Sequence, residues 1–296
     1  MNHRLGISLM ILTSFVFAFQ DGISKHLAVE YNSMMVVMIR YWFFGSFVIA
    51  LSATRQGGIR VVARTNQPLL QICRGVLLAA EIFIMITAIA LIGLAESLAL
   101  FACNPLIVAA LSGPILGERV GWRRWMAILA GLAGVLLILQ PGFRVFSPHS
   151  LLAVASAVMF AVYVLLTRYA ARRDSAETSF FWAGFAGAVG ATFAGIWFWQ
   201  PMAAPDWIWM GILCVSGATG HYILIKVYEI SEAGVVQPFA YFHMVFGSMI
   251  GIVIFGESLK ANVVAGGLVI VLAGLFVWWR EQASHGGEIS RFPDRR

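Results

Sequence analysis

The sequence predicts an all-α membrane protein with ten transmembrane helices, arranged as two five-helix repeats of inverted topology. Three observations predict this fold: the composition, the number of apolar segments of helix length, and a motif that recurs in both halves. Of the 296 residues, 60% are apolar and only 11% are charged, and the mean hydropathy is +0.85. Because a soluble domain carries about a quarter charged residues, this composition indicates that hydrocarbon surrounds most of the chain.

Ten apolar segments are each long enough to cross a membrane as a helix. A helix needs about 20 mostly apolar residues to cross about 30 Å of hydrocarbon. A transmembrane β-barrel would show segments of about ten residues with alternating polarity, whereas these segments are continuous apolar runs. The predicted spans cover residues 5–27, 33–53, 67–90, 95–115, 121–140, 150–171, 177–199, 206–228, 234–255 and 260–279.

The distribution of lysine and arginine predicts that both termini lie in the cytoplasm, because cytoplasmic loops carry an excess of these residues. With a cytoplasmic N-terminus, fourteen of the twenty fall on the cytoplasmic side and two, Arg144 and Lys260, on the opposite side. The other four lie within spans or at their ends. The fourteen are Arg4, Arg55, Arg60, Arg64, Arg119, Arg123, Arg124, Arg168, Arg172, Arg173, Arg280, Arg291, Arg295 and Arg296.

A short motif recurs in the two halves, with its Gly-Glu pairs 139 residues apart. The copies are Gly117-Glu118 followed by Leu132-Ala133-Gly134, and Gly256-Glu257 followed by Leu272-Ala273-Gly274. Because five is an odd number of spans, the second copy enters the membrane from the opposite side. Secondary transporters built in this way bind substrate between the halves, near the bilayer midplane. The predicted units are a first repeat over residues 1–141, a second over 142–280 and a cytoplasmic polar tail over 281–296.

Around these motifs the sequence resembles the EamA-type repeat of the drug/metabolite transporter superfamily. In the first half the resemblance is carried by Leu94-Ala95-Glu96-Ser97-Leu98-Ala99, Pro105 and Leu116-Gly117-Glu118-Arg119. In the second half it is carried by Ala233-Gly234-Val235-Val236-Gln237-Pro238 and Phe255-Gly256-Glu257-Ser258. It covers nearly the whole chain, to about Trp279.

The resemblance implies ten helices, cytoplasmic termini, and a cavity lined by the first, third, fourth, sixth, eighth and ninth spans. Within the family the chain is most similar to bacterial exporters of aromatic and other amino acids, which implies a multi-pass protein of the inner membrane. A related branch takes up nucleoside-like metabolites, and that alternative stays open.

Polar side chains inside the spans are the candidates for a substrate cavity, because a charge near the bilayer centre costs about 2.5–3.5 kcal/mol. Asp21 either binds a substrate amine or a proton, or forms an i,i+4 pair with Lys25. Glu81 either faces the cavity or is bonded to a polar group of a neighbouring helix, such as Arg40 or His221. The candidate cavity residues are Gln20, Asp21, Glu81, Phe101, Asn104, Tyr163, His221, Tyr222, Phe239, Tyr241 and His243.

Four further residues are candidate gates or hinges: Lys25, Arg74, Pro105 and Pro238. Proline lacks a backbone donor and bends a helix, which frees a carbonyl that can line a cavity. Each proline is therefore either a hinge or a static kink, and Arg74 is either a gate near the inner mouth or a structural partner. Glu118 and Glu257 precede helices, where the helix dipole favours a negative charge, and we expect both to be structural.

Glycines in two spans form the small-xxx-small patterns of close helix contact. They include Gly184, Gly187 and Gly190 in the seventh span, and Gly131 and Gly134 in the fifth. We expect these to hold the scaffold together or to form a subunit interface, and we assign them no transport chemistry.

We expect a secondary carrier that moves amino acids or similar small metabolites across the inner membrane by alternating access. Export is the expected direction, on the resemblance alone; the alternative is uptake or exchange of a nucleoside-like metabolite. The sequence has no pore-filter segment, no phosphate-binding loop and no catalytic motif, so neither a channel, an ATP-driven pump nor an enzyme is expected. No metal or other cofactor is expected. The expected partners are the substrate and the lipid bilayer, without nucleic acid, for a monomer or weak homodimer.

Overall fold

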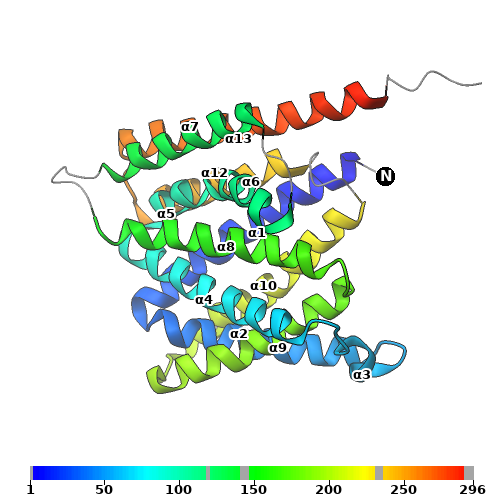
Figure 1. Ribbon diagram of the computed structural model, residues 1–296. Helices are drawn as coiled ribbons and strands as arrows, with labels where there is room; N and C mark the ends of the chain where they lie inside the picture. The colour runs from blue at the N-terminus through cyan, green and yellow to red at the C-terminus, as the bar shows by residue number, and fades with distance from the viewer. Residues whose placement is uncertain (1–2, 118–120, 141–146, 231–235, 290–296) are drawn as a thin grey trace, which may run out of the picture.

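The computed structural model describes residues 3–117, 121–140, 147–230 and 236–289, and every regular element within them is a helix. The α-helices are α1 (His3–Glu30), α2 (Ser33–Ala53), α3 (Gly58–Val62), α4 (Pro68–Ile92), α5 (Leu94–Phe101), α6 (Asn104–Leu116), α7 (Trp122–Leu139), α8 (Ser150–Ala170), α9 (Ala176–Gly195), α10 (Ala204–Ile230), α12 (Phe242–Phe255) and α13 (Ala261–Ile289). Two 3-10 helices are η1 (Ile196–Phe198) and η2 (Gln237–Tyr241). The long helices form a bundle, with α7 and α13 packed together on one flank and α2 and α9 on the opposite flank (Figure 1).

Seven helices in the described part of the chain are long and apolar enough to cross a membrane. They cover Arg4–Glu30, Ser33–Ala53, Pro68–Ile92, Leu94–Leu116, Ser150–Ala170, Ala176–Phe198 and Ala204–Leu224. Three shorter apolar helices cover Trp125–Leu139, Phe239–Phe255 and Ala261–Phe276. The prediction of an all-helical, multi-pass membrane protein is confirmed, while the count of ten crossings in two repeats stays a prediction.

The segment predicted as one span over 95–115 is divided into α5 and α6. The break falls at Ala102 and Cys103, and Pro105 occupies the first turn of α6. Because proline has no N–H, it cannot donate to the carbonyl of Phe101 and continue one helix through this point. The segment predicted over 234–255 is likewise irregular at its start, where η2 precedes α12.

The last helix is longer than predicted. α13 continues to Ile289, through the start of the segment predicted as a polar tail. Hydropathy marks where hydrocarbon ends, whereas residues such as Arg280, Glu281 and Gln282 still favour a helix in water. The helix boundary and the membrane boundary therefore differ here.

The glycine-rich faces make contacts within the chain. A Cβ atom added to Gly134 in α7 would lie 2.8 Å from the carbonyl oxygen of Gly266 in α13, so the two backbones meet directly. In α9, Gly184 packs against Val48 and Gly187 against the ring of Tyr41, both from α2. The small-residue patterns therefore join helices of the scaffold, as close packing in membranes requires.

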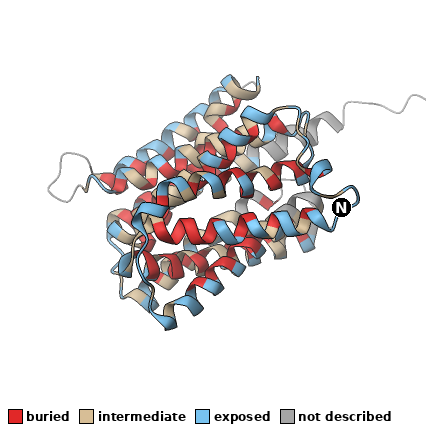
Figure 2. Ribbon diagram, turned by 90° about the horizontal axis from the view of Figure 1, so that it is seen from below, coloured by how far each residue is buried: buried red, intermediate tan, exposed pale blue. Residues whose placement is uncertain are grey.

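Buried residues gather on the helix faces that point into the bundle, and exposed residues on the outward faces (Figure 2). One apolar cluster includes Leu106, Ile138 and Ile270 from α6, α7 and α13. Another includes Tyr41 from α2 and Phe181 from α9.

The two ends of the bundle are distinguished by the chain termini. The start of α1, α3 and the C-terminal end of α13 lie at one end, which we call the terminal end (Figure 1). The opposite end, which we call the far end, contains the start of α5, the start of α8 and the end of α12.

Candidate functional site

Two predicted cavity residues from opposite halves of the sequence meet inside the bundle. Asp21 of α1 and His243 of α12 are joined by a hydrogen bond of 2.8 Å between Oδ2 and Nε2. Both side chains are largely buried, and the ring of Phe17 lies against His243 and His221. The expected alternative, an Asp21–Lys25 pair along α1, is therefore wrong.

Lys25 instead contacts Glu257, in the loop between α12 and α13. The carboxylate of Glu257 also accepts hydrogen bonds from the backbone N–H groups of Leu94, at 2.7 Å, and Ala95, at 2.9 Å. Burial opposes the ionisation of Glu257, but Lys25 and these two N–H groups outweigh it and hold the pKa of the carboxyl below its usual value. Glu257 thus caps α5.

This position of Glu257 corrects the sequence-based interpretation. The expected helix was the one that follows Glu257 in the chain, whereas the capped helix belongs to the other half. Gly93 makes the contact possible, because its φ of +94° suits glycine and a Cβ there would lie 2.9 Å from a carboxylate oxygen. Glu118, the counterpart in the first repeat, lies outside the described residues.

A second charged contact closes the same end of the bundle. Glu96 of α5 accepts from Lys260 at 2.9 Å and from the hydroxyl of Ser150, at the start of α8, also at 2.9 Å. Together with the Lys25–Glu257 pair, this contact joins α1, α5, α8 and the loop after α12 at the far end. Charged groups therefore hold these four segments together at the far end.

Glu81 is buried in α4 and accepts a hydrogen bond of 2.6 Å from the hydroxyl of Ser156 in α8. Of the two alternatives, Glu81 is thus bonded to a neighbouring helix, and the partner is neither Arg40 nor His221. The next residue of α8 makes a similar contact, because Asn104 of α6 donates to the carbonyl of Ala157 at 2.8 Å. Ser156 is a partner that sequence reasoning missed.

Arg74 is a fully buried clamp between three helices. Its guanidinium donates to Gln71 in α4, to Thr167 at 2.9 Å and Tyr163 at 3.3 Å in α8, and to the carbonyl of Ser179 in α9. The ring of Tyr163 also lies 5.2 Å from the guanidinium carbon. This arrangement fits the structural alternative for Arg74 and leaves its donors engaged.

Asp174 extends this polar cluster into the loop between α8 and α9. Burial opposes its ionisation, but hydrogen bonds from Thr65, Gln71 and the backbone of Asn66, with the charge of Arg74, lower the pKa of the carboxyl. The cluster fixes the loop to the start of α4.

The remaining predicted residues are spread along the bundle. Phe101 packs on Phe160 with ring centroids 5.5 Å apart. The carbonyl of Phe239 accepts from Ser14 at 3.2 Å, and the buried hydroxyl of Tyr241 lies against Gly274. Tyr222 is 45% exposed, with Lys226 over its ring. Pro105 is the second residue of α6 and Pro238 the second residue of η2, and the side chain of Pro238 lies outside the description.

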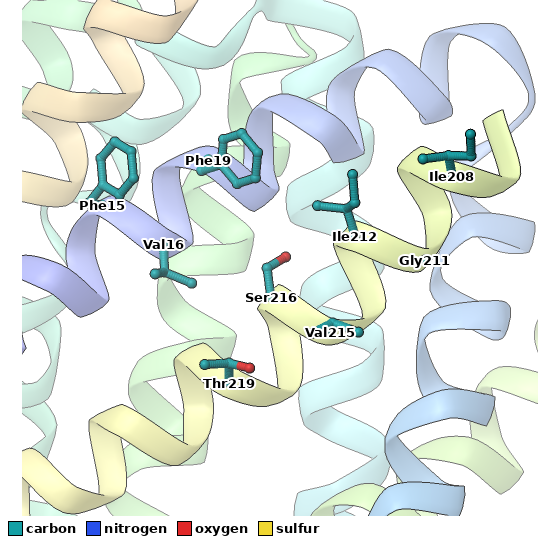
Figure 3. Close-up of a pocket in the computed structure, with 9 residues that line it drawn as sticks. All are labelled: Phe15, Val16, Phe19, Ile208, Gly211, Ile212, Val215, Ser216 and Thr219. Atoms are coloured by element: carbon teal, nitrogen blue, oxygen red, sulfur yellow. The ribbon is translucent and has the colours of Figure 1, made fainter. Parts of the chain in front are cut away.

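A large groove lies elsewhere, between α1 and α10. It has a volume of about 580 Å³ and an almost entirely apolar lining (Figure 3). Its lining residues are Phe15, Val16, Phe19, Ile208, Gly211, Ile212, Val215, Ser216 and Thr219. None of the predicted cavity residues lines this groove, and its apolar, open character suits hydrocarbon rather than a polar substrate.

A much smaller cavity, of about 10 Å³, lies between α2, α4 and α10. Such a volume holds about one water molecule. Arg40, Tyr41, Cys214 and His221 are among its lining residues. Sequence reasoning named His221 but not Arg40 as a site residue, although an arginine inside a span is itself a signal of function.

The family model and the named relatives that match this chain are all transporters. The model of the EamA-like transporter family matches the chain twice, over residues 4–140 and 148–279. The chain is 24% identical to the S-adenosylmethionine uptake transporter of Rickettsia prowazekii, with 94% of each chain covered. It is 27% identical to the riboflavin transporter of Vibrio cholerae, covering 93% of this chain and 94% of that one.

A further transporter and one solved structure are also similar to this chain. The pseudopaline exporter of Pseudomonas aeruginosa is 27% identical, with 91% of this chain and 94% of that one covered. A crystal structure of a protein 20% identical in sequence has a similar fold, with a TM-score of 0.61 over 90% of this chain and 95% of that one.

Proposed function

Because the chain belongs to the EamA-like transporter family, we propose that it is a secondary carrier that exports amino acids or similar small metabolites across a bacterial inner membrane. That it is a membrane transporter and not an enzyme follows from the family and from the named relatives. The substrate class, the direction and the inner-membrane location are our proposal.

The Asp21–His243 contact carries the proposal. It joins α1 of the first half to α12 of the second, at partly accessible side chains inside the bundle. A carboxylate there can bind the ammonium group of an amino acid in place of the imidazole, and Phe17 offers an apolar surface beside it. Transporters with inverted repeats bind substrate at this kind of interface.

Alternating access would require the far end to open. The charged contacts at this end are those of Lys25 with Glu257 and of Lys260 with Glu96. The short helix α5 separates the far end from the break at Ala102 and Cys103. At this break α5 could move relative to α6. We propose Lys25 as part of the outer gate and Pro105 as part of a hinge.

The two matches of the family model support the division into repeats at about residue 141. The terminal end holds Arg4 in α1 and Arg60 in α3, which supports a cytoplasmic location for this end under the positive-inside rule. A reporter fused at the C-terminus tests the topology, because a periplasmic signal would contradict ten crossings that start from a cytoplasmic N-terminus.

Uptake or exchange of a nucleoside-like metabolite is the second candidate. The specific observation in its favour is the similarity to S-adenosylmethionine uptake transporters. S-adenosylmethionine contains both an amino-acid group and a nucleoside, so a site for the first does not exclude the second.

A flux panel with the purified protein in liposomes decides between these candidates. Amino acids, nucleosides, S-adenosylmethionine and organic cations would be compared, with and without a pH gradient. We expect amino-acid flux that Asp21→Asn reduces and that Glu30→Gln, an exposed acid at the end of the same helix, leaves unchanged. The absence of flux for any amino acid would overturn the leading substrate class, and flux of nucleosides alone would favour the second candidate.

A further inference from the structure

Arg40 is a buried cation whose guanidinium is only partly used. It lies in the middle of α2 and is 8% exposed. Nη2 donates to Oε1 of Gln20 in α1 at 3.0 Å. A guanidinium has five N–H donors, and Gln20 is a neutral partner.

No carboxylate lies within ion-pair distance of Arg40 among the side chains that the structure describes. Glu81 interacts with the charge of Arg40 only at longer range, because its carboxylate is bonded to Ser156. A buried charge without a paired counter-ion is strongly unfavourable, and an amide does not neutralise it. A bound anion would therefore stabilise the buried charge of Arg40.

One side of Arg40 borders a small cavity. It lines the small cavity with Tyr41, Cys214 and His221, and that cavity lies between α2 and α4 of the first half and α10 of the second. Gly217 of α10 packs closely on this side, because a Cβ there would lie 3.2 Å from Nε of Arg40 and 3.3 Å from Oε1 of Gln20.

The adjacent residue of α1 has the opposite character. Gln20 holds Arg40, and Asp21, the next residue, holds His243. Of two consecutive residues of α1, Gln20 thus contacts a cation, Arg40, and Asp21 is itself an anion. An α-amino acid, which carries an ammonium and a carboxylate on one carbon, matches this pair of charges.

We propose that Arg40 anchors the carboxylate of the transported molecule, so that the cargo class is one with a free carboxylate. The inference rests on the proposed carrier function. In the conformation described here the cavity is too small for a metabolite. The carboxylate reaches Arg40 when α10 moves away from α2 and α4.

The test uses the purified full chain in liposomes and a matched pair of cargoes, phenylalanine and phenylalaninamide, which differ in the carboxylate. Arg40→Gln keeps a hydrogen-bonding partner for Gln20 and removes the charge, Arg40→Lys retains the charge, and Arg60→Gln on exposed α3 is the control. We expect Arg40→Gln to lower phenylalanine flux about ten- to a hundredfold, the size of one lost charged hydrogen bond. Flux of the amide should change less than about twofold, Arg40→Lys should be intermediate, and Arg60→Gln should match the wild type.

Equal loss of both cargoes in Arg40→Gln would overturn the inference and leave the carrier function standing, as would no loss at all. Wild-type protein that moves no amino acid would overturn the proposed substrate class instead. The inference is then decided by thermal stabilisation of the detergent-solubilised protein with phenylacetate or phenylacetamide. Stabilisation by phenylacetate alone, lost in Arg40→Gln, supports the anchor; equal shifts for both compounds, or none in the wild type, refute it.

Discussion

Glu257 accepts a hydrogen bond of 2.7 Å from the backbone N–H of Leu94, although 163 residues separate the two in the sequence. The same carboxylate contacts Lys25, so α1, the start of α5 and the loop after α12 meet at one charged group. If the far end opens here, the movement has to separate a charge pair and uncap a helix at the same time. The ion pair and the helix cap therefore share one carboxylate.

Glu257→Gln should lower the stability of the protein by about 1–2 kcal/mol, the range of a lost helix cap. The amide can replace one acceptor but neither the charge beside Lys25 nor the second carboxylate oxygen. Thermal unfolding in detergent measures the change. Glu177→Gln is the matched control, because Glu177 pairs with Arg55 on an exposed surface and such pairs contribute little. Equal effects of the two substitutions would contradict a capping role.

The contribution of Glu257 should also depend on pH. The pKa of the Glu257 carboxyl is lower in the folded protein than in the unfolded chain, where the pKa of a glutamate is about 4.3. The stabilisation is therefore fully present above the unfolded value and is lost as pH falls through the lower, folded value. The difference in melting temperature between wild type and Glu257→Gln, measured from neutral to strongly acidic pH, should shrink at the acidic end. A constant difference would mean that the charge does not matter.

Ser156→Ala should destabilise the protein by about 1–3 kcal/mol, because it leaves the buried Glu81 carboxyl without its hydrogen bond. Glu81→Gln should be milder, since an amide oxygen still accepts from Ser156. Ser8→Ala removes an exposed hydroxyl from α1 and serves as the control. Thermal unfolding of the three variants measures these changes. If Ser156→Ala were as stable as the control, Ser156 would not be the partner that stabilises Glu81.

Arg74→Lys should destabilise the protein by about 1–3 kcal/mol. A single ammonium group cannot reproduce the forked contacts to Gln71, Thr167 and the carbonyl of Ser179. Transport per folded molecule should stay within about twofold of wild type, because these contacts are structural. Unchanged stability with a large loss of flux would instead identify Arg74 as a gate.

Pro105→Ala should slow transport without weakening substrate binding. Alanine supplies the N–H that can bond to the carbonyl of Phe101 and join α5 to α6 into one stiffer helix. Concentration-dependent flux in liposomes separates the maximal rate, which should fall, from the half-saturating concentration, which should not. Pro114→Ala, deeper within α6, tests whether any proline in this helix has the same effect.

The helices could be predicted from the sequence because hydropathy is a local property. The ranges over 33–53, 121–140 and 150–171 agree with α2, α7 and α8 to within two residues. The break before Pro105 could not be placed, since proline at a helix start and proline at a kink look alike in an apolar run. The end of α13 was misplaced because helix formation continues beyond the hydrocarbon.

The sequence predicts several residues of the candidate site, but it does not predict which of their side chains contact one another. Asp21, Lys25 and His243 stand out because charge and histidine are rare inside spans, but spacing along α1 suggested the wrong pair. The true partners, His243 and Glu257, lie 222 and 232 residues away and are brought near by tertiary packing. Sequence reasoning names Arg40 only as a possible partner of Glu81, and the family resemblance implies a cavity on spans other than the second.

The direct meeting of Gly134 and Gly266 has a practical consequence for measuring motion. Because the two backbones pack this closely, we expect α7 and α13 to move together. The distance between spin labels on the outer faces of α7 and α13 should then stay constant. The distance from this pair to a label on α5 or α10 would measure how far those helices move.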